Sequence, residues 1–189
     1  VKRLRGPKGS KVKLGVQRRG IKDRLTFVVT RDKIPLTTVD VAYMIRPQVG
    51  YVRIESFGET TYDELMAALE KLKQQGMTKL ILDLQDNGGG YLKSAADIAN
   101  EFLSRGNLIV YTQGRRVPKQ EYTARGNGKY QDLPLYVLIN EYSASAAEIV
   151  SGAMQDHDRG TIIGRRSFGK GLVQRPVEFE DGSMMRITI

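Results

Sequence analysis

Apolar residues recur along the chain with two different periods, which predicts alternating helices and strands. Between Leu65 and Leu72 the apolar positions follow helical spacing, and Gly76 is expected to end this helix. Residues 79–85 (KLILDLQ) form a short apolar run that is typical of a buried strand. A second amphipathic pattern over residues 91–106 predicts another helix. This order of elements predicts an α/β fold with a layered, mostly parallel sheet and flanking helices.

The remaining expected elements are short strands, one more helix and two irregular segments. Alternating or β-branched patterns predict strands at residues 11–18, 25–31, 39–44, 50–56, 107–113, 134–140, 161–164, 172–179 and 184–189. The helix is expected over residues 146–155, and a hairpin turn at Glu180-Asp181-Gly182. Residues 1–10 look like the end of a basic helix that Gly6-Pro7 stops. Residues 114–131 are polar and contain glycine, which favours a mobile surface loop.

The net charge of +9 is concentrated at the amino-terminal end of the chain. Residues 1–33 contain 12 Lys and Arg against 2 Asp and Glu, whereas the rest contains 18 against 19. A nucleic-acid-binding arm is one interpretation, but the basic residues alternate with apolar ones and no aromatic platform accompanies them. The solvated face of two strands is favoured instead. Two strands are too few for a stable domain, so we expect the sequence to be a piece of a longer protein.

The counts of cysteine and histidine exclude several classes of enzyme. There is no cysteine, which removes thiol nucleophiles, disulfides and thiolate metal sites. The single histidine, His157, excludes the HExxH zinc motif, which needs two. In a continuous helix His157 would lie about 18 Å from Ser145, too far for a Ser-His-Asp triad. A serine hydrolase in this chain must therefore use another base. No apolar stretch approaches the length of a membrane span.

Candidate catalytic groups follow the carboxyl ends of two predicted strands, where ligands bind in open α/β sheets. Residues 86–90 (DNGGG) lack the GK[ST] ending of a nucleotide-binding loop and better suit the presentation of backbone N–H groups to an oxyanion. Ser145 stands at the start of a helix, where the helix dipole favours a developing negative charge. However, Ser145-x-x-Glu148 is also a capping box, which needs no chemistry.

Lys170 lies between two glycines, and Gln174 follows four residues later. An ordinary exposed lysine in a turn is one interpretation. Alternatively, the glycines allow tight packing around a desolvated amine that accepts the serine proton, and the glutamine amide holds this amine in place. The residues alone leave both interpretations open.

Four segments in this order resemble the carboxyl-terminal processing peptidases, also called tail-specific proteases: FxETTxxE, LDLQDNGGG, SASAAEI and FGKGLVQ. The opening LRGPKGSKVKL, followed by RDKIPL, is similar to the end of that family's PDZ domain and its connection to the protease core. The resemblance implies the carboxyl-terminal part of a PDZ domain at residues 1–33 and a linker at 34–48. Residues 49–189 would then be a ClpP/crotonase-like protease core, truncated at its carboxyl-terminal end.

The resemblance also implies a function, a serine endopeptidase that cleaves proteins near accessible carboxyl-terminal tails through an acyl-enzyme intermediate. Ser145 corresponds to the nucleophile, Lys170 to the general base and Gln174 to the residue that orients the lysine. The backbone N–H groups of Gly89 and Ala146 correspond to the oxyanion hole. No metal or cofactor is implied. The implied partners are protein or peptide substrates with exposed tails and not nucleic acid, a homo-oligomer is compatible, and the implied location is the bacterial periplasm or cell envelope.

Three alternatives stay open from the sequence alone. The first is a non-catalytic scaffold or peptide-binding protein of the same fold, in which Ser145 only caps a helix. The second is acyl-group chemistry on a coenzyme A thioester, which leaves Lys170 without a role. The third is nucleic-acid binding through residues 1–33, which predicts steep salt dependence.

Overall fold

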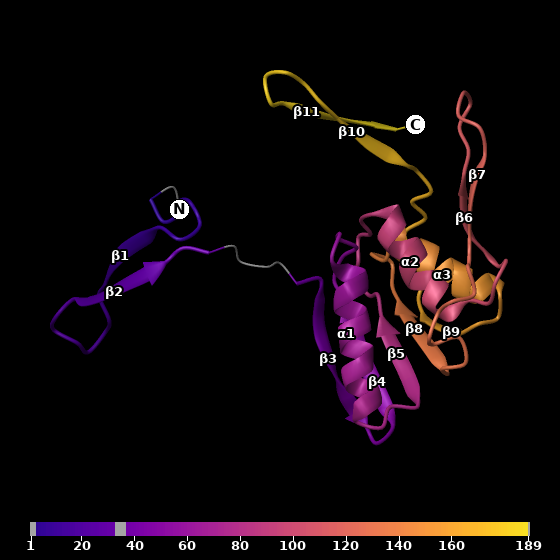
Figure 1. Cartoon of the computed structure of the whole chain (residues 1–189), viewed down its shortest axis with the longest axis horizontal. Helices are drawn as coiled ribbons and strands as arrows, with labels where there is room; N and C mark the ends of the chain where they lie inside the picture. The colour runs from indigo at the N-terminus through magenta and orange to yellow at the C-terminus, as the bar shows by residue number, and fades with distance from the viewer. Residues whose placement is uncertain (1–2, 33–36, 189) are drawn as a thin grey trace. The chain divides into compact units, whose positions relative to one another are not determined.

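The structure, a computed structural model, describes residues 3–32 and 37–188. The chain divides into two compact units, Val1–Leu36 and Thr37–Ile189. Figure 1 colours both units along the chain from the amino to the carboxyl terminus. The predicted linker, residues 34–48, begins in the segment 33–36, which lies outside the described residues, as does the predicted strand end at residue 189.

The first unit contains an antiparallel ribbon of two strands, β1 (Lys11–Val16) and β2 (Leu25–Thr30). Lys11 pairs with Thr30 and Val16 pairs with Leu25. The alternating sequence pattern predicted both strands. Five of the six residues of β2 are exposed to solvent, which agrees with a solvated ribbon.

The segment before this ribbon forms turns, so the prediction of a basic helix end was wrong for residues 3–10. Arg31 supplies the hydrogen bonds that organise these turns. Its Nε donates to the Leu4 carbonyl at 2.8 Å, and a terminal nitrogen donates to Ser10 Oγ at 2.9 Å. An arginine distant in sequence therefore donates hydrogen bonds to carbonyl groups that would otherwise pair within a helix. Gly6 and Pro7 disfavour that helix.

The second unit is built on a five-stranded sheet with the order β3-β4-β5-β8-β9. Its strands are β3 (Val39–Arg46), β4 (Val49–Ile54), β5 (Lys79–Asp83), β8 (Leu135–Ile139) and β9 (Thr161–Gly164). The pairs β4–β5, β5–β8 and β8–β9 are parallel, whereas β3 and β4 are antiparallel. The predicted layered α/β fold with a mostly parallel sheet is confirmed.

Three helices cover one face of this sheet, on the viewer's side in Figure 1. They are α1 (Thr61–Gln74), α2 (Leu92–Phe102) and α3 (Ala146–Asp156). Successive parallel strands advance in one direction across the sheet, so right-handed crossovers place all three helices on the same side. Their apolar sides and the inward residues of the strands form one buried core that includes Leu65, Leu69, Val52, Leu82 and Val137. Among the described residues, no helix combines the length and apolar character that crossing a membrane requires.

Two further ribbons extend from the second unit. One pairs β6 (Leu108–Thr112) with β7 (Gln120–Thr123), and the other pairs β10 (Gln174–Glu178) with β11 (Met184–Thr188). Gly182 adopts a φ of 79° in the predicted hairpin turn between β10 and β11. The expectation of a loop throughout residues 114–131 was wrong, because β7 lies inside that segment. Its mostly polar, exposed side chains hid the strand pattern.

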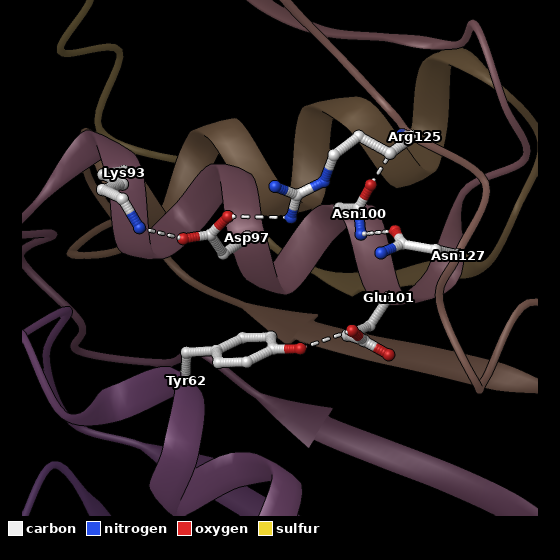
Figure 2. A network of polar contacts seen from close by, with 7 residues as sticks. All are labelled: Tyr62, Lys93, Asp97, Asn100, Glu101, Arg125 and Asn127. Carbon is white, nitrogen blue, oxygen red and sulfur yellow. Dashed lines mark hydrogen bonds and ion pairs between the residues drawn. The ribbon is translucent and has the colours of Figure 1, made fainter.

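The segment that follows β7 is fixed to α2 by buried polar side chains, as Figure 2 shows. Glu101 is only 5% exposed. It accepts hydrogen bonds from Tyr62 Oη at 2.6 Å and from the Lys129 N–H at 2.9 Å. The neighbouring Asn100 accepts the Arg125 N–H through Oδ1 at 2.7 Å. These bonds hold the base of the β6–β7 ribbon against α1 and α2.

Arg159 provides a second anchor for the same region. Its guanidinium donates to the carbonyl groups of Phe102, Tyr130 and Leu133, each at 2.7 Å. Burial lowers the pKa of Arg159 below its ordinary value, partly offset by Asp132. The arginine thus links the carboxyl end of α2 to the segment that leads into β8 through hydrogen bonds.

Candidate active site

Ser145 occupies a sharp turn between β8 and the first residue of α3. Its backbone has φ 56° and ψ −112°, a conformation that non-glycine residues rarely adopt. Such strain is concentrated at functional sites, and a strained strand-to-helix turn is the geometry that exposes the nucleophilic serine of other hydrolases. A simple helix cap does not need this conformation, so it favours a functional role for Ser145.

Ser143 has a structural role instead. It is fully buried, and its Oγ donates to the Leu84 carbonyl at 2.7 Å and accepts the Asn140 N–H at 2.9 Å. These bonds tie the turn before α3 to the end of β5. Of the two serines, only Ser145 lines the cleft described below.

The glycine loop lies directly against this turn. Gly89 has a φ of 95°, and a side chain there would meet the Ala144 carbonyl at 2.7 Å and Ser145 Cβ at 2.8 Å. Only glycine combines this backbone conformation with so close an approach. The loop is also held by the Ala144 N–H, which donates to the Asn87 carbonyl at 2.9 Å.

The two backbone N–H groups predicted for the oxyanion hole differ in their surroundings. Ala146 is the first residue of α3, where an N–H has no acceptor within the helix. The Gly89 N–H donates to Asn87 Oδ1 at 2.8 Å. Asn87 is fully buried and also donates through Nδ2 to the Ile54 carbonyl at 2.7 Å. The sequence did not single out Asn87, although its place within DNGGG was the available signal.

Lys170 is half-buried in the loop after β9, and Glu148 positions this loop. The Glu148 carboxylate accepts hydrogen bonds from the N–H groups of Gly169 and Lys170 at 2.7 and 2.9 Å. It also accepts hydrogen bonds from Ser167 Oγ at 2.7 Å and from the Ser145 N–H at 2.8 Å. The last of these bonds is the glutamate half of the predicted capping box. The sequence pattern showed only this capping role, and the bonds to the lysine loop were not foreseen.

The hydrogen bonds to Glu148 also determine its charge. Burial by itself raises the pKa of this carboxyl group, but the hydrogen bonds from Ser167, Lys170, Gly169 and Ser145 outweigh burial and lower the pKa below 4.5. Glu148 is therefore an ionised acceptor at neutral pH. Its negative charge lies next to the loop that carries the lysine.

Ser145 and Lys170 open into one cleft of about 1060 Å³. The walls come from the first turns of α1, α2 and α3, from the β6–β7 ribbon and from residues 170–175. Gln174, the first residue of β10, lines the same cleft. The sequence-predicted nucleophile, base and orienting amide thus share one cavity. Its size suits several residues of a peptide.

Among residues 3–32 and 37–188, no group of three or more His, Cys, Asp or Glu side chains is arranged to hold a metal ion. The chemistry that the cleft offers from its own side chains is a serine hydroxyl, a lysine amine and backbone N–H donors. This combination is suited to acyl transfer.

Comparisons with known proteins show which family the chain resembles. Residues 48–189 match the description of peptidase family S41. The chain is 40% identical over 190 residues to a carboxyl-terminal-processing protease of Synechocystis sp., with 99% of this chain and 44% of that protein covered. It is 37% identical over 186 residues to the carboxy-terminal processing protease CtpA of Bacillus subtilis, with 98% of this chain and 39% of that protein covered.

One solved structure is similar over nearly the whole chain. It is a photosystem II D1 C-terminal processing protease, with a TM-score of 0.67 and 32% sequence identity over 97% of this chain and 50% of that chain. The chain therefore spans less than half of the length of these curated relatives and half of the length of this solved structure.

Proposed function

The chain belongs to peptidase family S41, and from this premise we propose that it carries the catalytic centre of a serine endopeptidase of the carboxyl-terminal processing type. Ser145 is the nucleophile and Lys170 the general base. The observation that carries the proposal is the shared acceptor Glu148, whose carboxylate receives the N–H of both residues at 2.8 and 2.9 Å. One fixed anion thereby orients the backbone of the nucleophile and of the base toward the same cleft.

The reaction begins when Ser145 Oγ attacks the carbonyl carbon of the scissile peptide bond and its proton passes to the Lys170 amine, which acts as the general base. The tetrahedral intermediate collapses as the C–N bond breaks, and Lys170 returns the proton to the leaving amine. An ester between Ser145 and the acyl part of the substrate remains. Lys170 then takes a proton from water, the hydroxide attacks the ester, and Ser145 regains its proton as the product acid leaves.

The negative oxygen of each intermediate needs N–H donors. Ala146 presents one at the amino end of α3, where the helix dipole adds favourable potential. We assign the second to Gly89, whose N–H must be shared with Asn87 Oδ1 or released from it when the intermediate forms. We assign to Gln174, which lines the same cleft, the role of accepting a hydrogen bond from the Lys170 amine and directing this amine toward Ser145.

The proposed substrates are proteins with exposed carboxyl-terminal tails, because several relatives are named for processing of this kind. We assign residues 1–33 to the end of a PDZ domain that binds such tails by strand addition. Residues 34–48 are the linker and residues 49–189 the protease core. The relatives are bacterial proteins, and we place this one in the periplasm or cell envelope, where a homo-oligomer is compatible with the function.

A fluorophosphonate probe tests the roles of Ser145 and Lys170 in the natural-length protein that contains this chain. Labelling is expected at Ser145. Ser145→Ala should abolish labelling and cleavage, and Lys170→Ala should lower both by at least about 100-fold. The exposed Lys71→Ala is the matched control. Full activity of Lys170→Ala would contradict the proposal.

A further inference from the structure

The first turn of α2 contains a buried hydroxyl group without a partner. Ser94 is 6% exposed, and among the described residues its Oγ has no hydrogen-bond partner. A buried polar group left unpaired is destabilising, so such groups are rare unless water, an ion or a ligand supplies the missing partner. Ser94 lines the same cleft as Ser145. The missing partner can therefore come from a molecule in the cleft.

The backbone around Ser94 offers more donors. Tyr91 precedes α2 and makes no side-chain cap, and the first turn contains no acidic residue. The first hydrogen bond that leads into the helix is the Ala95 N–H to the Tyr91 carbonyl, at 3.2 Å. The N–H groups of Leu92, Lys93 and Ser94 precede it and have no acceptor within the helix. Together with the hydroxyl they favour an oxygen acceptor, and a negatively charged one most.

The charges next to this turn leave it positive. Asp97, one turn further along α2, lies between Lys93 at 2.6 Å and Arg125 at 3.2 Å, as Figure 2 shows. Two positively charged side chains thus pair with one carboxylate, which leaves a net positive charge at this turn. Glu59 and Asp63 line the cleft from the side of α1, so an anionic group is expected at the first turn of α2 and not beside α1.

The distance to the nucleophile limits where this anion lies on a substrate. Gly89 touches Ser145, since its missing Cβ would lie 2.8 Å from Ser145 Cβ. Ser94 follows five residues later, and consecutive Cα atoms are about 3.8 Å apart, so Ser94 lies within about 19 Å of Gly89. An extended peptide advances about 3.3 Å per residue. The anion therefore falls within about six residues of the scissile bond.

We propose that the first turn of α2, with Ser94 Oγ and the Lys93 ammonium group, is a carboxylate-binding subsite of the cleft. The free carboxyl terminus of the substrate is its ligand when cleavage occurs within about six residues of the chain end. An acidic side chain at the same distance supplies the same chemistry. The inference rests on the proposed peptidase function and adds a second recognition point for chain ends, separate from residues 1–33.

Binding to the inactive Ser145→Ala variant of the natural-length protein tests the subsite without cleavage. Calorimetry compares two peptides of one sequence, one ending in a free carboxylate and one in an amide. The acid is expected to bind about tenfold more tightly, because hydrogen bonds to charged groups are the stronger ones. Added Ser94→Ala or Lys93→Gln should reduce this preference at least threefold. A preference that is absent, or unchanged in Ser94→Ala, overturns the proposal.

Two further experiments identify the source of the carboxylate and test the role of Ser94. Amidated peptides with Glu or Gln within about six residues of the cleavage point report on side chains, and a Glu preference that Ser94→Ala removes supports the same subsite. Ser151→Ala is the matched control, since Ser151 is also 6% exposed but its Oγ donates to the Ala147 carbonyl at 2.9 Å. Ser94→Ala should leave the melting temperature unchanged or raised. A clear decrease would mean an internal partner and contradict the proposal.

Failure of the subsite and failure of the peptidase proposal give different results. Loss of cleavage in Ser145→Ala, together with equal binding of acid and amide peptides, would keep the peptidase and reject the subsite. Undiminished cleavage by Ser145→Ala would reject the peptidase, whatever the peptide binding shows.

Discussion

The main-chain N–H groups of Ser145 and Lys170 donate to one carboxylate oxygen, Oε2 of Glu148, at 2.8 and 2.9 Å. The two residues are 25 positions apart and come from different segments, the turn before α3 and the loop after β9. A single ionised side chain therefore fixes the relative placement of the backbone of both. Glu148 acts through these two residues and is a positioning residue.

We predict that Glu148→Gln lowers kcat of the natural-length protein by about 100-fold with little change in KM. A neutral amide has one acceptor oxygen, so it cannot receive the hydrogen bonds that the two carboxylate oxygens receive from Ser145 and the lysine loop. Loss of placement should slow the chemical step more than substrate binding. Steady-state kinetics on a tail peptide measure both constants.

Fluorophosphonate labelling separates this role from a loss of folding. Glu148→Gln should label slowly while its circular dichroism spectrum stays that of the wild type. Glu141→Gln is the control, because Glu141 is exposed and pairs only at the surface with Arg165 at 2.7 Å. Equal labelling rates in Glu148→Gln and the wild type would show that the shared acceptor has no part in catalysis.

Local patterns predicted most of the fold because they need no distant partner. Residues 161–164 were expected as a strand and β9 has these same bounds. The elements that were missed depend on contacts from elsewhere. β7 is a polar strand defined by its pairing with β6, and the turns at residues 3–10 depend on Arg31, more than 20 residues later.

The same distinction applies to the site. Ser145, Lys170 and Gln174 could be chosen from motifs, and the cleft brings all three together. No local pattern predicts that Asn87 takes the Gly89 N–H, because this bond depends on a side chain that is also anchored to β4 at the Ile54 carbonyl. The unpartnered Ser94 hydroxyl is likewise visible only once its surroundings are known.

The glycine loop allows a matched pair of substitutions. Gly89→Ala should lower kcat/KM by more than about 100-fold, because the φ of 95° is strained for alanine and the new Cβ would meet Ser145 Cβ at 2.8 Å. Gly88→Ala should keep at least half of the activity, since a Cβ there meets no atom within 4 Å. Peptide cleavage and thermal melting of both variants measure this. Equal losses in the two variants would remove the special role of Gly89.

Tyr62 is expected to stabilise the β6–β7 side of the cleft through Glu101. Tyr62→Phe removes the 2.6 Å hydrogen bond to a buried carboxylate and should lower the free energy of unfolding by about 1–3 kcal/mol. Tyr142→Phe, at an exposed position, should leave the free energy of unfolding unchanged. Denaturant unfolding measures both changes. If Tyr62→Phe left the free energy of unfolding unchanged, water would replace the phenol at Glu101 without loss of stability.

The ionisation of Tyr62 provides an independent measurement of the same contact. The hydrogen bond to Glu101, burial and the negative charge of Glu101 raise the pKa of Tyr62 to about 12. Ultraviolet titration of the wild type minus Tyr62→Phe should therefore show one phenol that ionises well above pH 10. A difference spectrum with a midpoint near 10 would contradict the contact.

Glu64 makes stability depend on pH in the acid range. Its Oε2 accepts the N–H groups of Thr38 and Val39 at 2.7 and 3.0 Å, and its Oε1 accepts Thr60 Oγ1 at 2.6 Å. Burial alone raises the pKa of Glu64, but these hydrogen bonds outweigh it and the pKa falls below 4.5. The unfolded chain therefore binds this proton more readily than the folded chain. The stabilisation is complete above pH 4.5 and is lost as pH falls through the folded pKa.

We predict that Glu64→Gln lowers the melting temperature at pH 7 and that its difference from the wild type shrinks below pH 4.5. Thermal melts between pH 7 and pH 3 measure this, with the exposed Glu70→Gln on the same helix as the control. Glu148 also has a lowered pKa, so the Glu64→Gln, Glu148→Gln double variant should have a flatter pH profile than either single variant. If the difference between Glu64→Gln and the wild type were constant from pH 7 to pH 3, the stabilisation would come from the shape of the side chain and not from its charge.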